Sequence, residues 1–175
     1  MERSSQAILA TALNFVRATT PKFVLSRTNR WVRPLNGQLV LNTDASFLED
    51  HTGSCGAVIR DHFGFFVATS TEKLDHVGDV ESAEAAALLE GLKLTRSIGA
   101  HTLVARADNM SVVEAMANNY EQLMVAGPIL DECHFLRLEF GEVFFQHCNR
   151  ESNRVAHRLA QQGRDDPPAS WLDAP

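Results

Sequence analysis

The order of strand-like and helix-like segments constrains the fold of this chain more than any other feature of its sequence. Three strand-like segments, 38–46, 54–61 and 64–74, are separated by short turns, and the second turn runs through the cluster RDHFG. From residue 80 onward, helix-like and strand-like segments alternate. This order predicts an antiparallel three-stranded meander followed by α/β units, joined in one mixed sheet with helices packed on it.

Six further elements are predicted after the meander. The first is a long helix over 80–99, rich in alanine and leucine, free of proline and ending at a glycine. The others are a strand over 101–107, helices over 109–119 and 128–140, a strand over 142–148 and a last helix over 152–163. The expected order is therefore βββαβααβα, and 175 residues suffice for one such domain with a sizeable core.

Two segments of different composition flank the predicted domain, which spans 31–163. Residues 1–33 carry six basic side chains and one acidic side chain, whereas the rest of the chain carries 10 basic and 21 acidic ones. We interpret residues 1–30 as a basic linker or N-terminal extension with a short helix over 4–18, although organelle transit peptides have a similar composition. Residues 164–175 are expected to form a loose C-terminal tail.

Composition narrows the class of protein further. No apolar run approaches the ~20 residues of a membrane helix, so no membrane partner is expected. We also expect the protein to be a monomer. The three cysteines form no CxxC pair, which argues against a disulfide framework and favours a nuclear or cytoplasmic location, with an organelle as the alternative. The acidic main part disfavours tight non-specific binding to nucleic acid, because neutralisation of phosphates dominates such affinity.

Three acidic residues lie on predicted apolar faces or at the end of a predicted strand. Asp44 lies in the first predicted strand, on the same face as Val40. Glu84 lies within the small and apolar stripe of the long helix, where glutamate is rarely buried unless it is paired. Asp108 follows the strand over 101–107, either as the N-cap of the next helix or as part of a ligand site past a strand end. The three carboxylates suit a hard divalent cation such as Mg²⁺, although each also has a local structural explanation.

Four motifs on these elements, NTDAS, ESAEAAALLEGL, ARADN and HCNRESNRVAHRLA, resemble those of the ribonuclease H family. The nearest match is the ribonuclease-H-like domain associated with reverse transcriptases of plant non-LTR retroelements and its stand-alone relatives. The resemblance covers residues 31–163. It implies an α/β fold with a five-stranded mixed sheet, three antiparallel strands then two parallel ones, and helices on both faces. It also implies cleavage of the RNA strand of RNA–DNA hybrids with two Mg²⁺ ions.

The resemblance assigns roles to individual residues. Asp44, Glu84 and Asp108 match the metal-binding and catalytic carboxylates of the family. The fourth acidic position is occupied by His157, a candidate metal ligand that suits Mn²⁺ better than Mg²⁺, or else an ordinary surface histidine. His147 has the spacing of a catalytic histidine that assists proton transfer or product release, or is a strand-end histidine. The polar candidates for contact with substrate 2′-hydroxyls are Asn42, Ser46 and Asn109.

Three functions remain open from the sequence. The first is a metal-dependent nuclease of low activity, in which Mn²⁺ can replace Mg²⁺. The second is a non-catalytic nucleic-acid-binding or interaction module, favoured by His157 and by the neutral-to-acidic connection over 118–127, where some members of the family have a basic element that grips the hybrid. The third is a zinc protein that uses the histidines and cysteines Cys133, His134, His147, Cys148 and His157.

Overall fold

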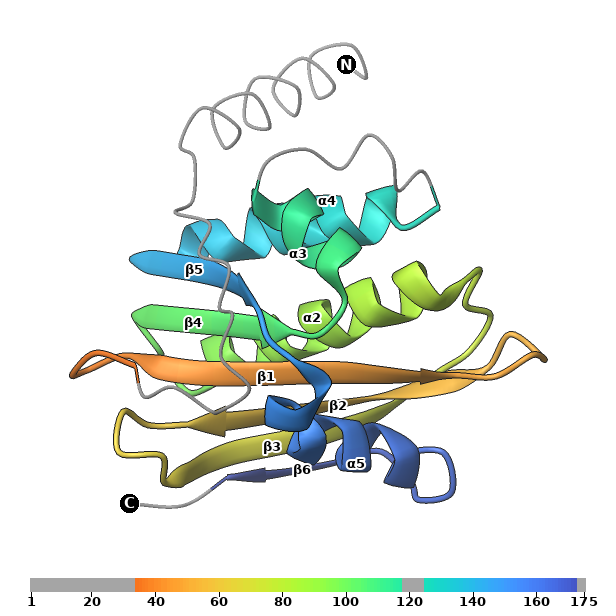
Figure 1. Ribbon diagram of the computed structural model, residues 1–175, viewed down its shortest axis with the longest axis horizontal. Helices are drawn as coiled ribbons and strands as arrows, with labels where there is room; N and C mark the ends of the chain where they lie inside the picture. The colour runs from red at the N-terminus through yellow and green to blue at the C-terminus, as the bar shows by residue number, and fades with distance from the viewer. Residues whose placement is uncertain (1–33, 118–124, 173–175) are drawn as a thin grey trace, which may run out of the picture.

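A computed structural model describes residues 34–117 and 125–172 of the chain. The basic segment over 1–30, the expected helix over 4–18 and most of the connection over 118–127 lie outside the described residues. Six strands form one mixed sheet in the order β5-β4-β1-β2-β3-β6 (Figure 1). The strands are β1 (Leu39–Phe47), β2 (Gly53–Arg60), β3 (Phe66–Leu74), β4 (Thr102–Ala107), β5 (Glu142–His147) and β6 (Ala169–Leu172).

The pairing of the first five strands confirms the predicted fold. β1 pairs antiparallel with β2, and β2 pairs antiparallel with β3, which gives the meander. β4 then pairs parallel with β1, and β5 pairs parallel with β4. As a result β1 lies inside the sheet with a neighbour on each side, and its residues Val40 to Asp44 are all buried.

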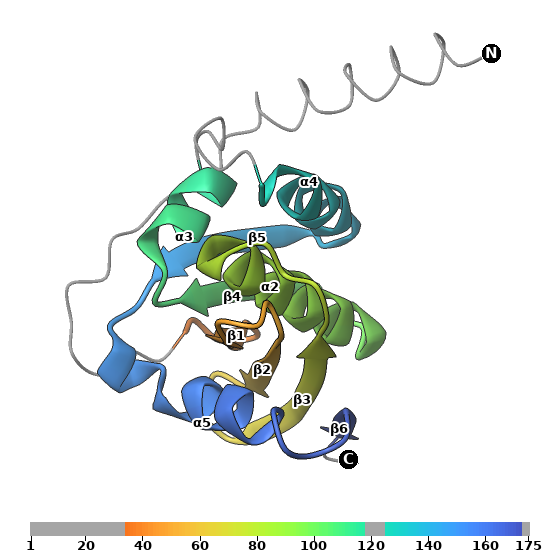
Figure 2. The ribbon, with the colours of Figure 1, turned by 90° about the vertical axis from the view of Figure 1, so that its right-hand side faces the viewer.

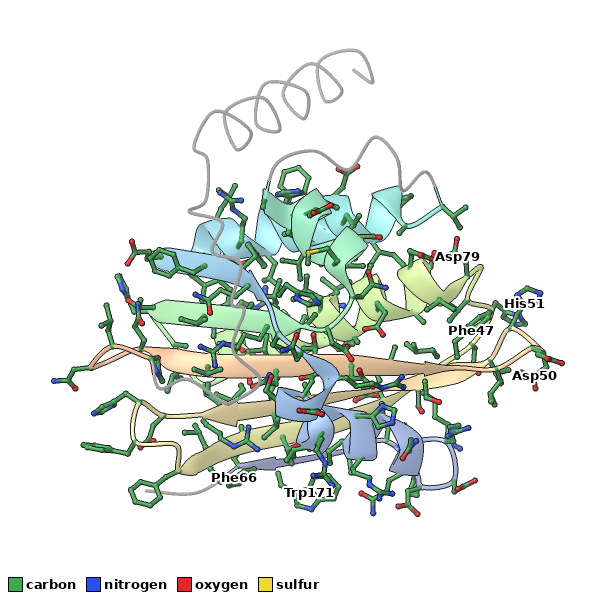
Figure 3. The ribbon with its side chains drawn as sticks, in the orientation of Figure 1. Phe47, Asp50, His51, Phe66, Asp79 and Trp171 are labelled. Atoms are coloured by element: carbon green, nitrogen blue, oxygen red, sulfur yellow. The ribbon has the colours of Figure 1, made fainter. Side chains whose placement is uncertain are left out.

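The sixth strand corrects the expectation that residues 164–175 are loose. Within that tail, Ala169–Leu172 form β6, which pairs antiparallel with residues 68–71 of β3 and carries Trp171, labelled in Figure 3. Without β6, the outer edge of β3 would present unpaired backbone groups to solvent. A four-residue segment preceded by two prolines carries little strand signal of its own, so the pairing depends on the edge that β3 offers.

Four described helices pack on the sheet, with α5 on the opposite face from the others (Figure 2). They are α2 (Val80–Ser97), α3 (Met110–Ala117), α4 (Gly127–Leu136) and α5 (Arg154–Gln162), with 3-10 turns at Arg137–Glu139 and Arg150–Ser152. Buried residues of α2, α3 and α4 share one hydrophobic core with the strands, and α5 contributes none to it. Of the helices in the described ranges, none is long and apolar enough to span a membrane.

The start of α2 is fixed by its N-cap. The side chain of Asp79 accepts a hydrogen bond from the backbone N–H of Ser82 at 2.7 Å, and Figure 3 shows Asp79 at this end of the helix. This cap satisfies one of the free N–H groups of the first turn. Glu84, one turn and a half after this cap, is among the residues of α2 that are buried against the sheet.

Two glycines allow the helices to approach the sheet closely. A Cβ on Gly91 of α2 would lie 2.6 Å from Cγ2 of Thr43. A Cβ on Gly56 of β2 would lie 2.5 Å from the backbone nitrogen of Ala160 in α5. Gly56 is also the β2 partner of Asp44. The close packing of α5 on β2 therefore takes place beside Asp44, and it brings α5 within reach of that carboxylate.

We expect Gly56→Ala to destabilise the protein by about 2 kcal/mol or more, because the added methyl group meets backbone atoms of α5 that cannot move independently. The matched control is Gly127→Ala, since a Cβ at Gly127 meets no atom within 4 Å. Chemical denaturation of the two variants and the unchanged protein measures the difference. Equal stability of Gly56→Ala and the unchanged protein would contradict the close packing of α5 on β2.

Candidate metal centre

The three predicted carboxylates converge where β4 ends and β1 continues. The parallel pairing of β1 with β4 runs only as far as Asn42 and Arg106. Asp44 lies two residues farther along β1, Asp108 directly follows β4, and Glu84 reaches this point from α2. One oxygen from each of the three carboxylates lies within 4.8 Å of the others. In the part of the chain that the structure describes, this is the only cluster of at least three acidic, histidine or cysteine side chains with such spacing.

Asp108 is available for this cluster because its neighbour caps the helix. The side chain of Asn109 accepts a hydrogen bond from the backbone N–H of Val112 at 3.1 Å, at the start of α3. Asn109 is therefore the N-cap, and the alternative in which Asp108 serves as the cap is wrong. The predicted substrate contact of Asn109 stays a prediction, with its side-chain oxygen engaged at this cap.

Burial makes the cluster electrostatically costly without a cation. Asp44 is 3% exposed and Glu84 is 8% exposed. Desolvation is the main cause that raises the pKa of Asp44 to about 6, and the neighbouring Asp108 raises it further while His157 lowers it. Desolvation, together with the charges of Asp44 and Asp108, raises the pKa of Glu84 to about 9. Carboxylates placed in this way resist ionisation unless a positive charge comes between them.

The donor set fits a hard divalent cation. Oε2 of Glu84 is buried and has no hydrogen-bond partner among the described residues, which is a costly state for a carboxyl oxygen. The cluster supplies only carboxylate oxygens, the ligands that Mg²⁺ and Mn²⁺ accept and that Zn²⁺ usually shares with nitrogen or sulfur. The three predicted ligands Asp44, Glu84 and Asp108 are thus held together in a geometry that a divalent cation would stabilise.

His157 of α5 forms a hydrogen bond to one residue of the cluster, Asp44. It is not one of the side chains that lie close enough together to share a cation. Its Nδ1 lies 2.9 Å from Oδ2 of Asp44. Its Nε2 lies 3.1 Å from the amide nitrogen of Gln161, one turn later on α5. Because an amide nitrogen donates, Nε2 accepts and Nδ1 carries the hydrogen that is donated to Asp44. Both ring nitrogens are engaged, which argues against the predicted metal ligation and for a role in orienting Asp44.

Asn153 is the residue that the sequence interpretation missed. It is 1% exposed, and its amide nitrogen donates to the backbone oxygen of Thr43 at 2.8 Å. The same nitrogen lies 3.4 Å from one oxygen each of Asp44 and Asp108. Its carbonyl oxygen accepts from Asn42 at 3.0 Å. Asn153 stands at the N-cap position of α5 without making a side-chain cap bond. Nothing in the sequence indicated its contacts, because an asparagine before a helix indicates an ordinary N-cap.

The other predicted site residues lie around the cluster rather than in it. His147, the last residue of β5, places Nε2 at 3.1 Å from the backbone oxygen of Asp108. Asn42 is 1% exposed and holds Asn153, so its placement argues against the predicted substrate contact. Ser46 is half-buried near the end of β1. The predictions of a catalytic His147 and a substrate-binding Ser46 stay predictions.

The zinc alternative finds no support in the arrangement of the histidines and cysteines. Cys133 is buried in the core beneath α2, with Sγ at 3.9 Å from the backbone oxygen of Ala85. Cys148 is buried beside Asn42. Burial also raises the pKa of the Cys148 thiol to about 12, which disfavours the thiolate that zinc requires. The five side chains proposed for zinc all fall in the described ranges and form no ligand cluster there.

Comparison with solved structures finds the same fold in ribonucleases H. The RNase H1 of the archaeon Halobacterium salinarum shares 19% identity with a TM-score of 0.69, over 74% of this chain and 98% of that one. The N-terminal RNase H domain of a Mycobacterium tuberculosis protein shares 23% identity with a TM-score of 0.65, over 73% and 94%. LC11-RNase H1, solved in complex with an RNA/DNA hybrid, shares 20% identity with a TM-score of 0.63, over 71% and 94%.

The sheet, the placement of the helices and the cluster at the end of β4 define a ribonuclease-H-like domain. At these identities, the likeness to the solved structures concerns the fold alone. A family model described as reverse transcriptase-like matches residues 42–163, and the chain belongs to this reverse transcriptase-like family. A comparison with curated proteins found no match.

Proposed function

We propose that this protein is a metal-dependent endonuclease that cleaves the RNA strand of RNA–DNA hybrids. The observation that carries the proposal is the convergence of Asp44, Glu84 and Asp108 within 4.8 Å, two of them buried, at the end of β4. Without a cation such a cluster lowers the stability of the folded protein, because burial disfavours each charge and the charges repel one another. The family and the fold support the same function.

The mechanism assigns a task to each residue of the centre. Asp44, Glu84 and Asp108 would hold the cations, with two Mg²⁺ expected. When bound, the ions supply activation of the attacking water and stabilisation of the leaving 3′ oxygen. His157 of α5 and Asn153 just before this helix hold Asp44 in place. His147 is our candidate for carrying the proton that the leaving oxygen requires, since its Nε2 lies 3.1 Å from the backbone oxygen of Asp108 and thus beside the cluster.

One observation favours the alternative of a non-catalytic nucleic-acid-binding module. The centre contains three carboxylates, and the residue in the fourth acidic position of the family, His157, is bonded to Asp44 and Gln161. A second Mg²⁺ therefore lacks a charged ligand. We propose that the protein cleaves hybrids slowly and needs more Mg²⁺ than a centre with four carboxylates, and that Mn²⁺, which also binds carboxylate oxygens, can replace Mg²⁺.

The test is cleavage of a labelled RNA–DNA hybrid across Mg²⁺ and Mn²⁺ titrations, with double-stranded DNA as the control substrate. We expect the unchanged protein to cut only the RNA strand. We expect His157→Asp to lower the Mg²⁺ concentration for half-maximal rate by roughly tenfold, because it returns a charged ligand to the centre. If neither protein cuts the hybrid at any concentration of either metal, the binding module is the correct function.

A further inference from the structure

A cavity of about 800 Å³ lies at the C-terminal end of α5, apart from the three carboxylates. Its lining residues are Leu48, Arg158, Gln161, Gln162, Arg164 and Asp165. Leu48 directly follows β1, and the remaining residues belong to α5 and to the turn after it. No predicted site residue lines this cavity, and the proposed chemistry does not use it.

The cavity contains two cationic side chains that form no ion pair with an acidic side chain in the described ranges. Arg158 and Arg164 are both exposed. The ion pairs found between described residues involve other side chains, and neither guanidinium forms a hydrogen bond to another described residue. With Asp165 as the one acidic lining residue, the cavity has a net charge of +1, whereas the whole chain has a net charge of −6. The cavity is therefore a local site of attraction for an anion on an acidic protein.

Hydrogen bonds connect this cavity to the carboxylate cluster. Gln161, which lines the cavity, donates to His157, and His157 donates to Asp44. Along β1, the four residues from Asp44 to Leu48 span about 13 Å, given a rise of ~3.3 Å per residue. The end of α5 that lines the cavity is held to the sheet, because the hydroxyl of Ser54 in β2 donates a hydrogen bond to the backbone oxygen of Ala160 in α5. The cavity and the cluster are thus parts of one rigid surface.

We propose that this cavity binds a backbone phosphodiester of the nucleic acid whose scissile phosphate lies at the carboxylate cluster, an inference that rests on the proposed function. A separation of about 13 Å places the cavity a few nucleotides from the scissile phosphate along one strand, because the phosphates of a strand are spaced ~3.4 Å apart along the helix axis. The planar guanidinium groups of Arg158 and Arg164 match phosphate oxygens, and the amides of Gln161 and Gln162 add neutral donors. On an otherwise acidic domain, the cavity supplies the positive charge that a nucleic-acid backbone requires.

The test measures binding of a fluorescent 16-base-pair RNA–DNA hybrid by anisotropy in Ca²⁺, which shares the oxygen ligands of Mg²⁺. We expect the double variant Arg158→Gln/Arg164→Gln to lose affinity on the order of tenfold and to lower the slope of log affinity against log salt by about 2. Asp165→Asn should raise the affinity, because it removes the acidic lining residue. The control Arg96→Gln removes one positive charge on α2, across the sheet from the cavity, and should leave the affinity unchanged.

The outcomes separate this proposal from the proposed function. Equal affinity of the double variant, Arg96→Gln and the unchanged protein would overturn the phosphate site even if the hybrid is cut in Mg²⁺. The expected loss of affinity without any cleavage in Mg²⁺ would support the phosphate site and overturn the nuclease. An unchanged protein that binds no hybrid would overturn both. Thermal melts of each variant confirm that the exposed substitutions leave the fold intact.

Discussion

Asp44→Asn is expected to abolish metal-dependent cleavage of the hybrid, with a loss on the order of a thousandfold or more. In the proposed centre Asp44 would be the central ligand, held in place by His157 at Oδ2 and lying beside Asn153 at Oδ1. Asparagine keeps the shape of the side chain and removes the charge. The remaining carboxylates, Glu84 and Asp108, then hold a divalent cation too weakly to place it at the scissile phosphate.

Two controls make the loss of activity interpretable. Asp75→Asn is the matched substitution at an exposed aspartate between β3 and α2, and it should leave the rate unchanged. Stability should fall little in Asp44→Asn, because the amide oxygen can still accept from His157 and because burial already raises the pKa of Asp44 and thereby disfavours its charge. A variant that is folded, as shown by its thermal melt, and that still cuts the hybrid at the normal rate would remove Asp44 from the proposed mechanism.

Much of the fold follows from patterns that are local in the sequence. The three strands of the meander, the long helix with Glu84 on its buried stripe and the alternation after Gly99 each depend on periodicity and turn residues within one segment. The carboxylates were recognisable because an acid on a buried face contradicts its surroundings. Their convergence then follows from topology, since β1 and β4 are parallel neighbours and α2 crosses beside them.

The parts that the sequence did not predict depend on partners that are distant along the chain. β6 forms because β3 offers an edge, about 100 residues earlier. Asn153 reaches Thr43 and the two aspartates only because Gly56 allows α5 to lie against β2. His157 could not be interpreted correctly from the sequence either. A histidine at this position suggested a metal ligand, and only the position of Gln161 in the structure shows that both ring nitrogens are engaged.

Glu84→Gln is expected to stabilise the metal-free protein at pH 8 by an amount on the order of 3 kcal/mol. Burial raises the pKa of Glu84 from 4.5 to about 9 in the folded protein. The folded state therefore holds its proton more tightly than the unfolded state does. The protonated Glu84 thus contributes to the free energy of unfolding, and this contribution is complete below pH 4.5. It is lost progressively as the pH rises toward 9. Glutamine does not ionise in this pH range, so the stability of the variant does not fall for this reason.

Mg²⁺ should reverse the order of stability of the two proteins. In the unchanged protein at pH 8, the cation requires ionised carboxylates and stabilises the folded state, by about 4.1 kcal/mol at a concentration of about 1,000 times its dissociation constant. In Glu84→Gln the gain should be much smaller, because Oε2 of Glu84 is lost as a ligand. Glu142→Gln, at an exposed glutamate of β5, is the control that should respond to Mg²⁺ like the unchanged protein.

Thermal melts at pH 5 and pH 8, with and without Mg²⁺, measure both effects. Without metal, the melting temperature of the unchanged protein should fall between the two pH values by more than that of Glu84→Gln. A lower stability of Glu84→Gln at pH 8 without metal would mean that the ionised Glu84 is already satisfied by the protein, and the argument for a cation from its unpaired oxygen would fail. An equal response of both proteins to Mg²⁺ would place the metal elsewhere. The combination of a costly buried acid without metal and a stabilised protein with metal is what a binding site for a divalent cation requires.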